Sequence, residues 1–133
     1  MSNKYEVFTD GGSRGNPGIS AYAFVVFLDN QEIFSSSGFL GISTNNKAEY
    51  TALLNALNFI HNERYEDVTL FSDSELMVKQ IKGEYKVKDE DLKKFYFECK
   101  ELILKIKNFE IIHVRREKNK RADYLVNKVL DEQ

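Results

Sequence analysis

The sequence predicts a single α/β domain built on a five-stranded mixed sheet, three antiparallel strands followed by two parallel ones, with helices on both faces. Three strand-like segments come first, and helical patterns then alternate with two further strand-like segments. Consecutive strands with short connections form an antiparallel meander, whereas strands separated by helices return in parallel. A chain of 133 residues, 42% hydrophobic and 30% charged, has the size and composition of one globular domain. We expect that domain to span residues 1–133.

The first three strands are expected over Lys4 to Thr9, Ser20 to Leu28 and Glu32 to Phe39, which are rich in aromatic and β-branched residues. Gly11 to Gly18, which contains the only proline, is the predicted turn between the first two strands. Asp29-Asn30 predicts a hairpin turn between the second and the third.

Capping residues and apolar spacing place the later elements. Thr44 or Asn45 can cap a first helix, and Ser74 can cap a second helix that ends near Gly83. The remaining elements are a strand over Asp67 to Ser72, a helix over Asp89 to Lys107, a strand over Phe109 to Val114 and a helix over Asn119 to Leu130.

Four acids stand in four separate local contexts. Asp10 follows the first strand, Glu49 lies early in the first helix, Asp73 ends the fourth strand and Asp123 opens the last helix. Taken singly, each acid is ordinarily a turn, cap or first-turn helix residue. Acids on neighbouring strands, joined by acids from two helices, can instead converge into a cluster of hard oxygen ligands. Such a cluster suits Mg²⁺, and two of these ions suit phosphoryl transfer.

The sequence around these acids resembles the type 1 ribonuclease H family from about Tyr5 to Leu130. The matching blocks are Phe8 to Gly18, Thr44 to Glu49 and Asp73-Ser74, and with Asp123 they follow the order and spacing of the family. The resemblance implies a ribonuclease H-like domain. It also implies a metal-dependent endonuclease that hydrolyses the RNA strand of RNA/DNA hybrids and leaves 5′-phosphate and 3′-hydroxyl ends.

The resemblance further implies a role for each acid. Asp10 would bridge two Mg²⁺ ions, because an acid on a central strand can be approached from two sides. Glu49 and Asp73 would hold the ion near the leaving 3′ oxygen, and Asp123 the ion that activates water. Mn²⁺ is the expected substitute.

Substrate contacts are expected close to the acids. Gly11, Gly12 and Ser13 offer small side chains and backbone amides that a minor groove can approach. The resemblance implies that Asn16, Asn45 and Asn46 contact bases or sugars in the minor groove. It also implies that Thr44 contacts a DNA phosphate. Turn formation and helix capping are the alternative roles of these four.

Three departures from the family pattern bear on function. Glu75 stands where many members have glutamine, and it can face Lys79 one helical turn later. Arg116 occupies the stretch in which some bacterial members carry a histidine; arginine is no general base, so we assign it to phosphate binding or product release. A tryptophan-rich basic helix of some relatives is absent. His113 we place on a sheet face, with no catalytic part.

Composition limits the setting and the partners. The net charge of −2 argues against binding of nucleic acid by bulk electrostatics, although two basic stretches, around Lys82 and around Arg115, favour phosphate contact. A lone cysteine, Cys99, indicates a reducing, cytoplasmic setting. No apolar run is long enough for a membrane span, and we expect a monomer.

Three other functions stay open at this point. The enzyme could also act on double-stranded RNA, or the chain could be a non-catalytic module that binds RNA/DNA hybrids. An intact set of four like charges argues against the module, since a binder gains nothing from their repulsion. The chain could also be a detached domain of a reverse transcriptase or integrase, although its beginning and end around one domain favour an independent enzyme.

Overall fold

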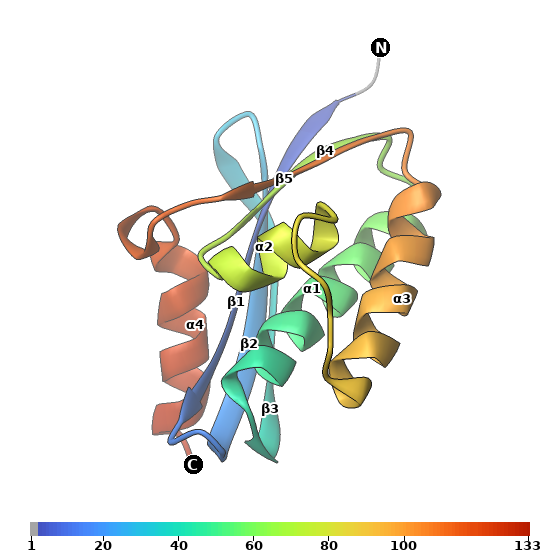
Figure 1. The fold of residues 1–133 in the computed structure, drawn as a ribbon. Coiled ribbons are helices and arrows are strands. Elements are labelled where there is room, and N and C mark those ends of the chain that lie inside the picture. Colours follow the sequence, from blue (N-terminus) through green and yellow to red (C-terminus); the bar gives the residue numbers. More distant parts are fainter. Residues whose placement is uncertain (1–2) are drawn as a thin grey trace.

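A five-stranded sheet forms the centre of the computed structural model, which describes residues 3–133 (Figure 1). The strands are β1 (Lys4–Arg14), β2 (Gly18–Leu28), β3 (Gln31–Ser43), β4 (Asp67–Ser72) and β5 (Asn108–His113), and their order in space is β3-β2-β1-β4-β5. The pairs β1–β2 and β2–β3 are antiparallel, and the pairs β1–β4 and β4–β5 are parallel. The predicted mixed sheet is confirmed.

The glycine-rich segment after Asp10 is strand, so the turn predicted from Gly11 to Gly18 is wrong over most of its length. Gly11 pairs with Tyr22 and Ser13 with Ser20, which places Asp10 inside β1 instead of at its end. The turn itself is confined to residues 15–17. Glycine adopts extended backbone as readily as turn backbone, and here the close packing of β1 against its neighbours selects the extended form.

The hairpin predicted at Asp29-Asn30 is present. Both residues have positive φ angles, 51° and 64°, as a two-residue turn between twisted antiparallel strands requires. The third strand runs beyond the predicted Phe39 to Ser43, because its pairing with β2 continues past a bulge opposite Ser20 and Ala21.

Within residues 3–133 the helices are α1 (Asn45–Asn62), α2 (Glu75–Ile81), α3 (Glu90–Leu104) and α4 (Lys120–Asp131), with a short 3-10 turn, η1 (Arg116–Lys118), before α4. Thr44 caps α1 and Ser74 caps α2, each by accepting a backbone N–H, as predicted. The 3-10 turn was not predicted. No helix in this part of the chain combines the length and the apolar character that a membrane span requires.

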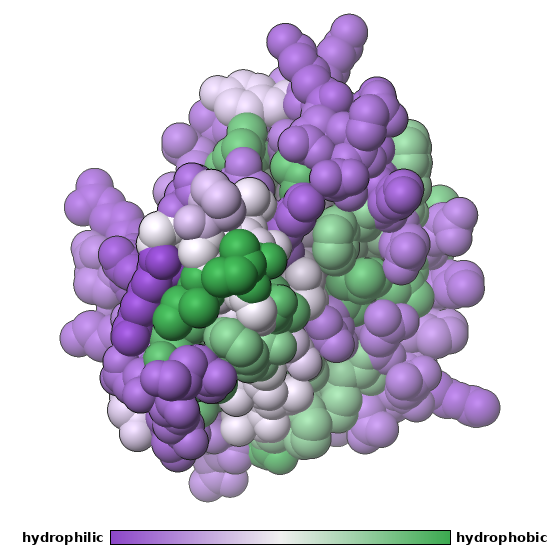
Figure 2. All heavy atoms as spheres, turned by 90° about the horizontal axis from the view of Figure 1, so that it is seen from below, coloured by the Kyte–Doolittle hydropathy of each residue, from purple (hydrophilic) through white to green (hydrophobic). Residues whose placement is uncertain are grey.

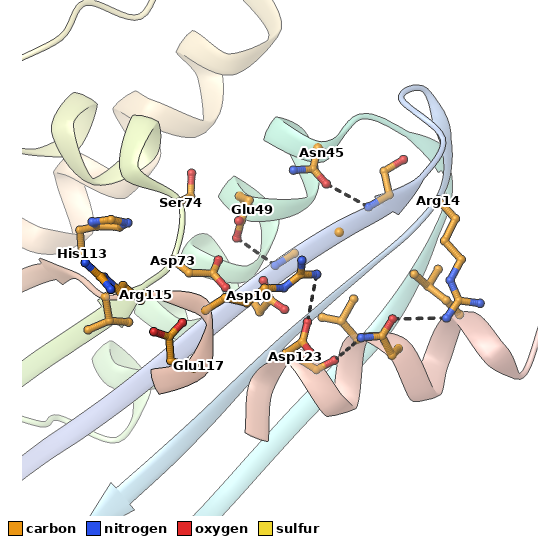
Figure 3. Close-up of a pocket in the computed structure, with 18 residues that line it drawn as sticks. Asp10, Arg14, Asn45, Glu49, Asp73, Ser74, His113, Arg115, Glu117 and Asp123 are labelled. Carbon is orange, nitrogen blue, oxygen red and sulfur yellow. Dashed lines mark hydrogen bonds and ion pairs between the residues drawn. The ribbon is translucent and has the colours of Figure 1, made fainter. Parts of the chain in front are cut away.

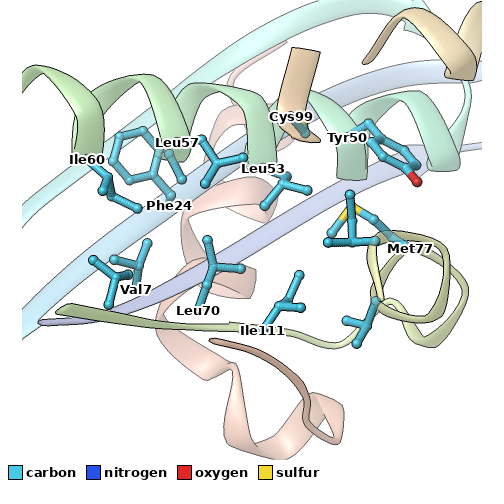
Figure 4. Close-up of a cluster of buried hydrophobic side chains, with 14 of the residues drawn as sticks. Val7, Phe24, Tyr50, Leu53, Leu57, Ile60, Leu70, Met77, Cys99 and Ile111 are labelled. Atoms are coloured by element: carbon cyan, nitrogen blue, oxygen red, sulfur yellow. The ribbon is translucent and has the colours of Figure 1, made fainter. Parts of the chain in front are cut away.

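The main core lies between the sheet and α1, with α2 and α3 completing the layer (Figures 1 and 4). Its fully buried side chains include Val7 and Leu70 of the sheet and Leu53, Leu57 and Ile60 of α1. The opposite face is covered by α4, which packs Val126 and Leu130 onto the small residues Ala21 and Ala23 of β2. Helices therefore cover both faces, as predicted.

The end of the molecule at which β1 and β3 finish carries hydrophilic side chains around its margin and a strongly apolar group of side chains near its centre (Figure 2). Ile42, which pairs in register with Ile19, is 73% exposed at this end. Single exposed apolar residues of this kind are ordinary on soluble proteins, so Ile42 by itself assigns no partner.

Candidate active site

Three of the four acids come together beside the central strands (Figure 3). Side-chain oxygens of Asp10, Glu49 and Asp73 lie within 4.8 Å of one another. Thr9 pairs with Ser72 in the parallel register of β1 and β4, so the residues that follow, Asp10 and Asp73, lie side by side. The third acid reaches the strands from α1.

Gly11 allows α1 to approach β1 closely enough to deliver Glu49. A Cβ atom on Gly11 would lie 2.2 Å from the carbonyl carbon of Ala48, a distance that no side chain tolerates. The backbone N–H of Gly11 donates to Oε1 of Glu49 at 2.9 Å. This close packing therefore requires glycine at residue 11, in addition to the substrate contact expected from the sequence.

Asp123, in the first turn of α4, lies at the margin of this cluster rather than within it. It is half-buried, and its Oδ1 is 3.5 Å from Nη2 of Arg116. Arg116 itself is exposed and belongs to η1. The arginine is therefore placed beside the acids, with its charge opposite to theirs.

Burial and mutual repulsion raise the pKa values of the clustered carboxyls. Burial, followed by the charges of Asp73 and Asp123, raises the pKa of Asp10 to about 8. The pKa of Glu49 is raised well above its usual range, first by burial and then by the charges of Asp10 and Asp73. The pKa of Asp73 is also raised by burial, against the opposing effects of the Asn119 amide and the Arg116 guanidinium. Near neutral pH the cluster therefore favours either protons or a bound cation.

Asn119 is a residue of the site that the sequence analysis missed. It is 1% exposed, and its Nδ2 donates to the backbone oxygen of Thr9 at 2.8 Å, directly before Asp10. Its Oδ1 is buried without a hydrogen-bond partner among the described residues. No pattern in the sequence separates this residue from an ordinary helix-start asparagine, because only the fold brings the end of η1 to the centre of β1.

A cavity of about 700 Å³ opens over the acids. Most of the predicted site residues line it: Asp10, Gly11, Gly12, Ser13, Asn45, Glu49, Asp73, Arg116 and Asp123. Four predicted substrate residues do not line it, namely Asn16, Thr44, Asn46 and Glu75. Arg14 and His113 line it without having been predicted, and His113 does so from the end of β5.

The asparagines predicted to contact substrate also hold the loop and helix together. Oδ1 of Asn45 accepts the N–H of Ser13 at 3.1 Å, and Oδ1 of Asn16 accepts the N–H of Asn45 at 3.1 Å. These bonds tie the β1–β2 turn to the start of α1. Asn16 and Asn45 therefore have a structural role, which was the alternative to substrate contact. Glu75 pairs with Lys79 at 3.8 Å across one helical turn, the arrangement expected if its charge is to be offset.

The strand order and the acids on the central strands define a ribonuclease H-like domain. The family described as reverse transcriptase-like matches residues 8–129, and the chain belongs to this family.

Named relatives and solved structures are similar to this chain in sequence and in fold. Ribonuclease HI of Halobacterium salinarum is 37% identical over 130 residues, which are 97% of this chain and 65% of the relative. The crystal structure of RNase H1 from that archaeon has a TM-score of 0.93 at 36% identity and covers 98% of this chain and 99% of its own. LC11-RNase H1, solved in complex with an RNA/DNA hybrid, has a TM-score of 0.91 at 38% identity, covering 97% of this chain and 98% of its own.

Proposed function

We propose that the chain is an endoribonuclease that hydrolyses the RNA strand of RNA/DNA hybrids and leaves 5′-phosphate and 3′-hydroxyl ends. The observation that carries the proposal is the group of three carboxylates within 4.8 Å, on the floor of a cavity, in a ribonuclease H-like chain. The hybrid bound to LC11-RNase H1, at 38% identity, supports the choice of substrate. We further propose that residues 1–133 act as one catalytic domain, as a monomer in the cytoplasm.

The donor set fits a hard divalent cation. All the candidate ligands are carboxylate oxygens, which Mg²⁺ and Mn²⁺ prefer over softer ligands. The pKa values of Asp10 and Glu49 are raised first by burial and then by the charges of neighbouring acids, and a bound divalent cation would offset that repulsion. Asp10, Glu49, Asp73 and Asp123 would hold the ions. Bound there, the ions would supply activation of the attacking water and stabilisation of the leaving oxygen.

The surrounding residues then orient the substrate. The segment Gly11 to Ser13 presents backbone and small side chains along one wall of the cavity, where a minor groove can approach. Asn45 lines the same cavity and can contact a base or sugar. Asn16, Asn46, Thr44 and Glu75 lie outside its lining, so any contact they make would be with more distant parts of the duplex. Arg116, exposed beside Asp123, would bind a phosphate or assist product release.

A cleavage panel tests the proposal. Wild type and Asp73→Asn are given an end-labelled RNA/DNA hybrid, duplex RNA, duplex DNA and a DNA duplex with one ribonucleotide, with Mg²⁺, with Mn²⁺ or with chelator. We expect metal-dependent cutting of the RNA strand in the hybrid and no cutting by the variant. Cutting of duplex RNA at a similar rate would broaden the substrate class. Binding of the hybrid without cutting under either metal would show a non-catalytic module instead.

A further inference from the structure

A second cavity lies on the face of the sheet that α4 leaves uncovered. Helix α4 begins at Lys120 and covers the part of this face that includes Ala21, Ala23 and Gly12. At the amino-terminal end of α4 there is a cavity of about 250 Å³. It is smaller than the roughly 300–1,000 Å³ pockets that enclose drug-sized ligands, which limits its occupant to about one ring system.

The floor of this cavity is aromatic. Phe8 and Phe27 line it, and neither ring is fully buried. The two rings meet edge to face with centroids 5.6 Å apart, and Phe8 is backed by Phe71, stacked at 4.6 Å. Rings held in fixed orientation by one another form a platform on which another planar ring can pack at little cost in side-chain entropy.

The rim of the cavity is positively charged. Lys118, Lys120 and Arg121 line it, against a single lining carboxylate, that of Glu6. Arg121 already pairs with Glu32, at 2.8 Å. The two lysines are exposed and belong to no ion pair within residues 3–133, so they are available to an anion.

The cavity adjoins the acid cluster. Phe8 precedes Asp10 by two residues on β1, and side chains two apart in a strand point to the same face. Asn119 lies between the second cavity and the acid cluster. It lines the cavity, and its amide donates to the backbone oxygen of Thr9 beside the acids. Lys118 and Lys120 belong to the segment between Arg116 and Asp123, two residues that line the first cavity, so this one segment borders both cavities.

We propose that this second cavity binds an unpaired nucleotide of a single strand that continues from the hybrid held at the acid cluster. The inference rests on the function proposed above and narrows its substrate to hybrids with a single-stranded tail. A base inside a duplex is already stacked on its neighbours, whereas an unpaired base is free to stack on Phe8 and Phe27. Lys118 and Lys120 hold the adjoining phosphates. Because base and phosphate are common to RNA and DNA, tails of either kind bind.

Binding measured without cleavage tests this inference. Fluorescence anisotropy with the Asp73→Asn protein compares a blunt hybrid with hybrids that carry an RNA or a DNA tail at either end. We expect a tail at one end to tighten binding at least about fivefold, the least that one stacked base contributes. Lys118→Glu with Lys120→Glu should abolish the gain. Lys105→Glu with Lys107→Glu, which makes the same charge change beyond the end of α3, should keep it.

Two further comparisons separate the possible failures. Phe27→Leu keeps the apolar volume but removes the ring, and it should lose the gain while the melting temperature shows that the fold is intact. Equal affinities for tailed and blunt hybrids, or a gain that survives the lysine changes, would overturn the inference. Wild-type cleavage of the blunt hybrid is followed in parallel. If that hybrid is cut and a tail adds nothing, only this inference fails; if a tail adds affinity but no hybrid is cut, only the proposed function fails.

Discussion

The burial of Asp10 and Glu49, which are 6% and 5% exposed, makes their charges costly to the metal-free fold. Each is held by a contact that leaves it little freedom: Glu49 accepts the N–H of Gly11, and the strand before Asp10 is bonded by Asn119. The residues that make the site chemically useful therefore lower the stability of the fold in the absence of cations.

The pH dependence of stability should reveal this cost. The folded-state pKa of Asp10, about 8, lies above the ordinary 3.8, so the folded protein binds the proton of this carboxyl more tightly than the unfolded chain does. Protonated Asp10 therefore imposes no charge cost on the fold below pH 3.8, and this relative stability is lost as the pH rises towards 8. The metal-free Asp10→Asn protein should therefore be more stable than wild type at pH 8, by roughly 1–3 kcal/mol. The advantage should shrink at pH 5. Denaturant unfolding in chelator at both pH values measures it, and a variant less stable than wild type at pH 8 would contradict the account.

Asn119→Ala should lower cleavage of the hybrid about 10- to 100-fold, because residues that orient metal-binding groups typically matter to that extent. Its matched control is Asn55→Ala on α1, since Asn55 also donates to a backbone oxygen at 2.8 Å and does not line the cavity over the acids. Steady-state cleavage and Mn²⁺ affinity are measured for both, with melting temperatures. Equal losses of activity in the two variants would show that Asn119 has only a structural role.

At the scale of elements, the contact between β1 and α1 fixes the geometry of the site. Helix α1 carries Glu49 and strand β1 carries Asp10. The helix contacts the strand at Gly11, where the backbone of Ala48 occupies the space that a side chain would fill. The N-cap at Thr44 and the bonds of Asn45 and Asn16 then hold the start of the helix to the β1–β2 turn. A small displacement of α1 therefore moves one of the acids.

Gly11→Ala should destabilise the protein by about 1–3 kcal/mol or more and abolish most of its activity, because the new Cβ would meet backbone atoms that cannot yield. Gly12→Ala serves as the control for stability. Its Cβ would lie 3.4 Å from a side-chain methyl of Val126, close to ordinary contact, so stability should change little. Urea unfolding and hybrid cleavage are compared for the two proteins. An alanine at residue 11 that leaves both unchanged would show that the helix is not positioned by this contact.

At the scale of the whole molecule, the mixed five-stranded sheet and the meeting of Asp10, Glu49 and Asp73 could be predicted from the sequence, whereas Asp123 lies at the margin of the predicted cluster. Strand patterns, caps and acid spacing are local, and parallel pairing then brings Asp10 beside Asp73. The extension of β1 through Gly11 to Arg14 could not be predicted, since glycine tolerates both turn and strand and only the pairing with β2 decides. Asn119 was missed for the same kind of reason, because its importance depends on a contact with residue 9.

The charge distribution of the whole molecule predicts steep salt dependence of hybrid binding. With a net charge of −2, the chain has only local clusters of lysine and arginine for the phosphates. We expect modest affinity that falls with salt, by close to one power of the salt concentration for each phosphate contacted. Anisotropy titrations at several salt concentrations measure the slope. A slope near zero would show that phosphate contacts contribute little.

The central claim is that the acid cluster carries metal-dependent cleavage, and the rate of RNA-strand cleavage as a function of Mg²⁺ concentration tests it most directly. Wild type, Asp73→Asn and Asp67→Asn are compared; Asp67 begins the strand that Asp73 follows, at the end away from the cluster. We predict that wild type and Asp67→Asn are inactive in chelator and become active as Mg²⁺ is added, whereas Asp73→Asn stays inactive throughout. Cleavage in chelator, or an Asp73→Asn protein as active as wild type, would contradict the account.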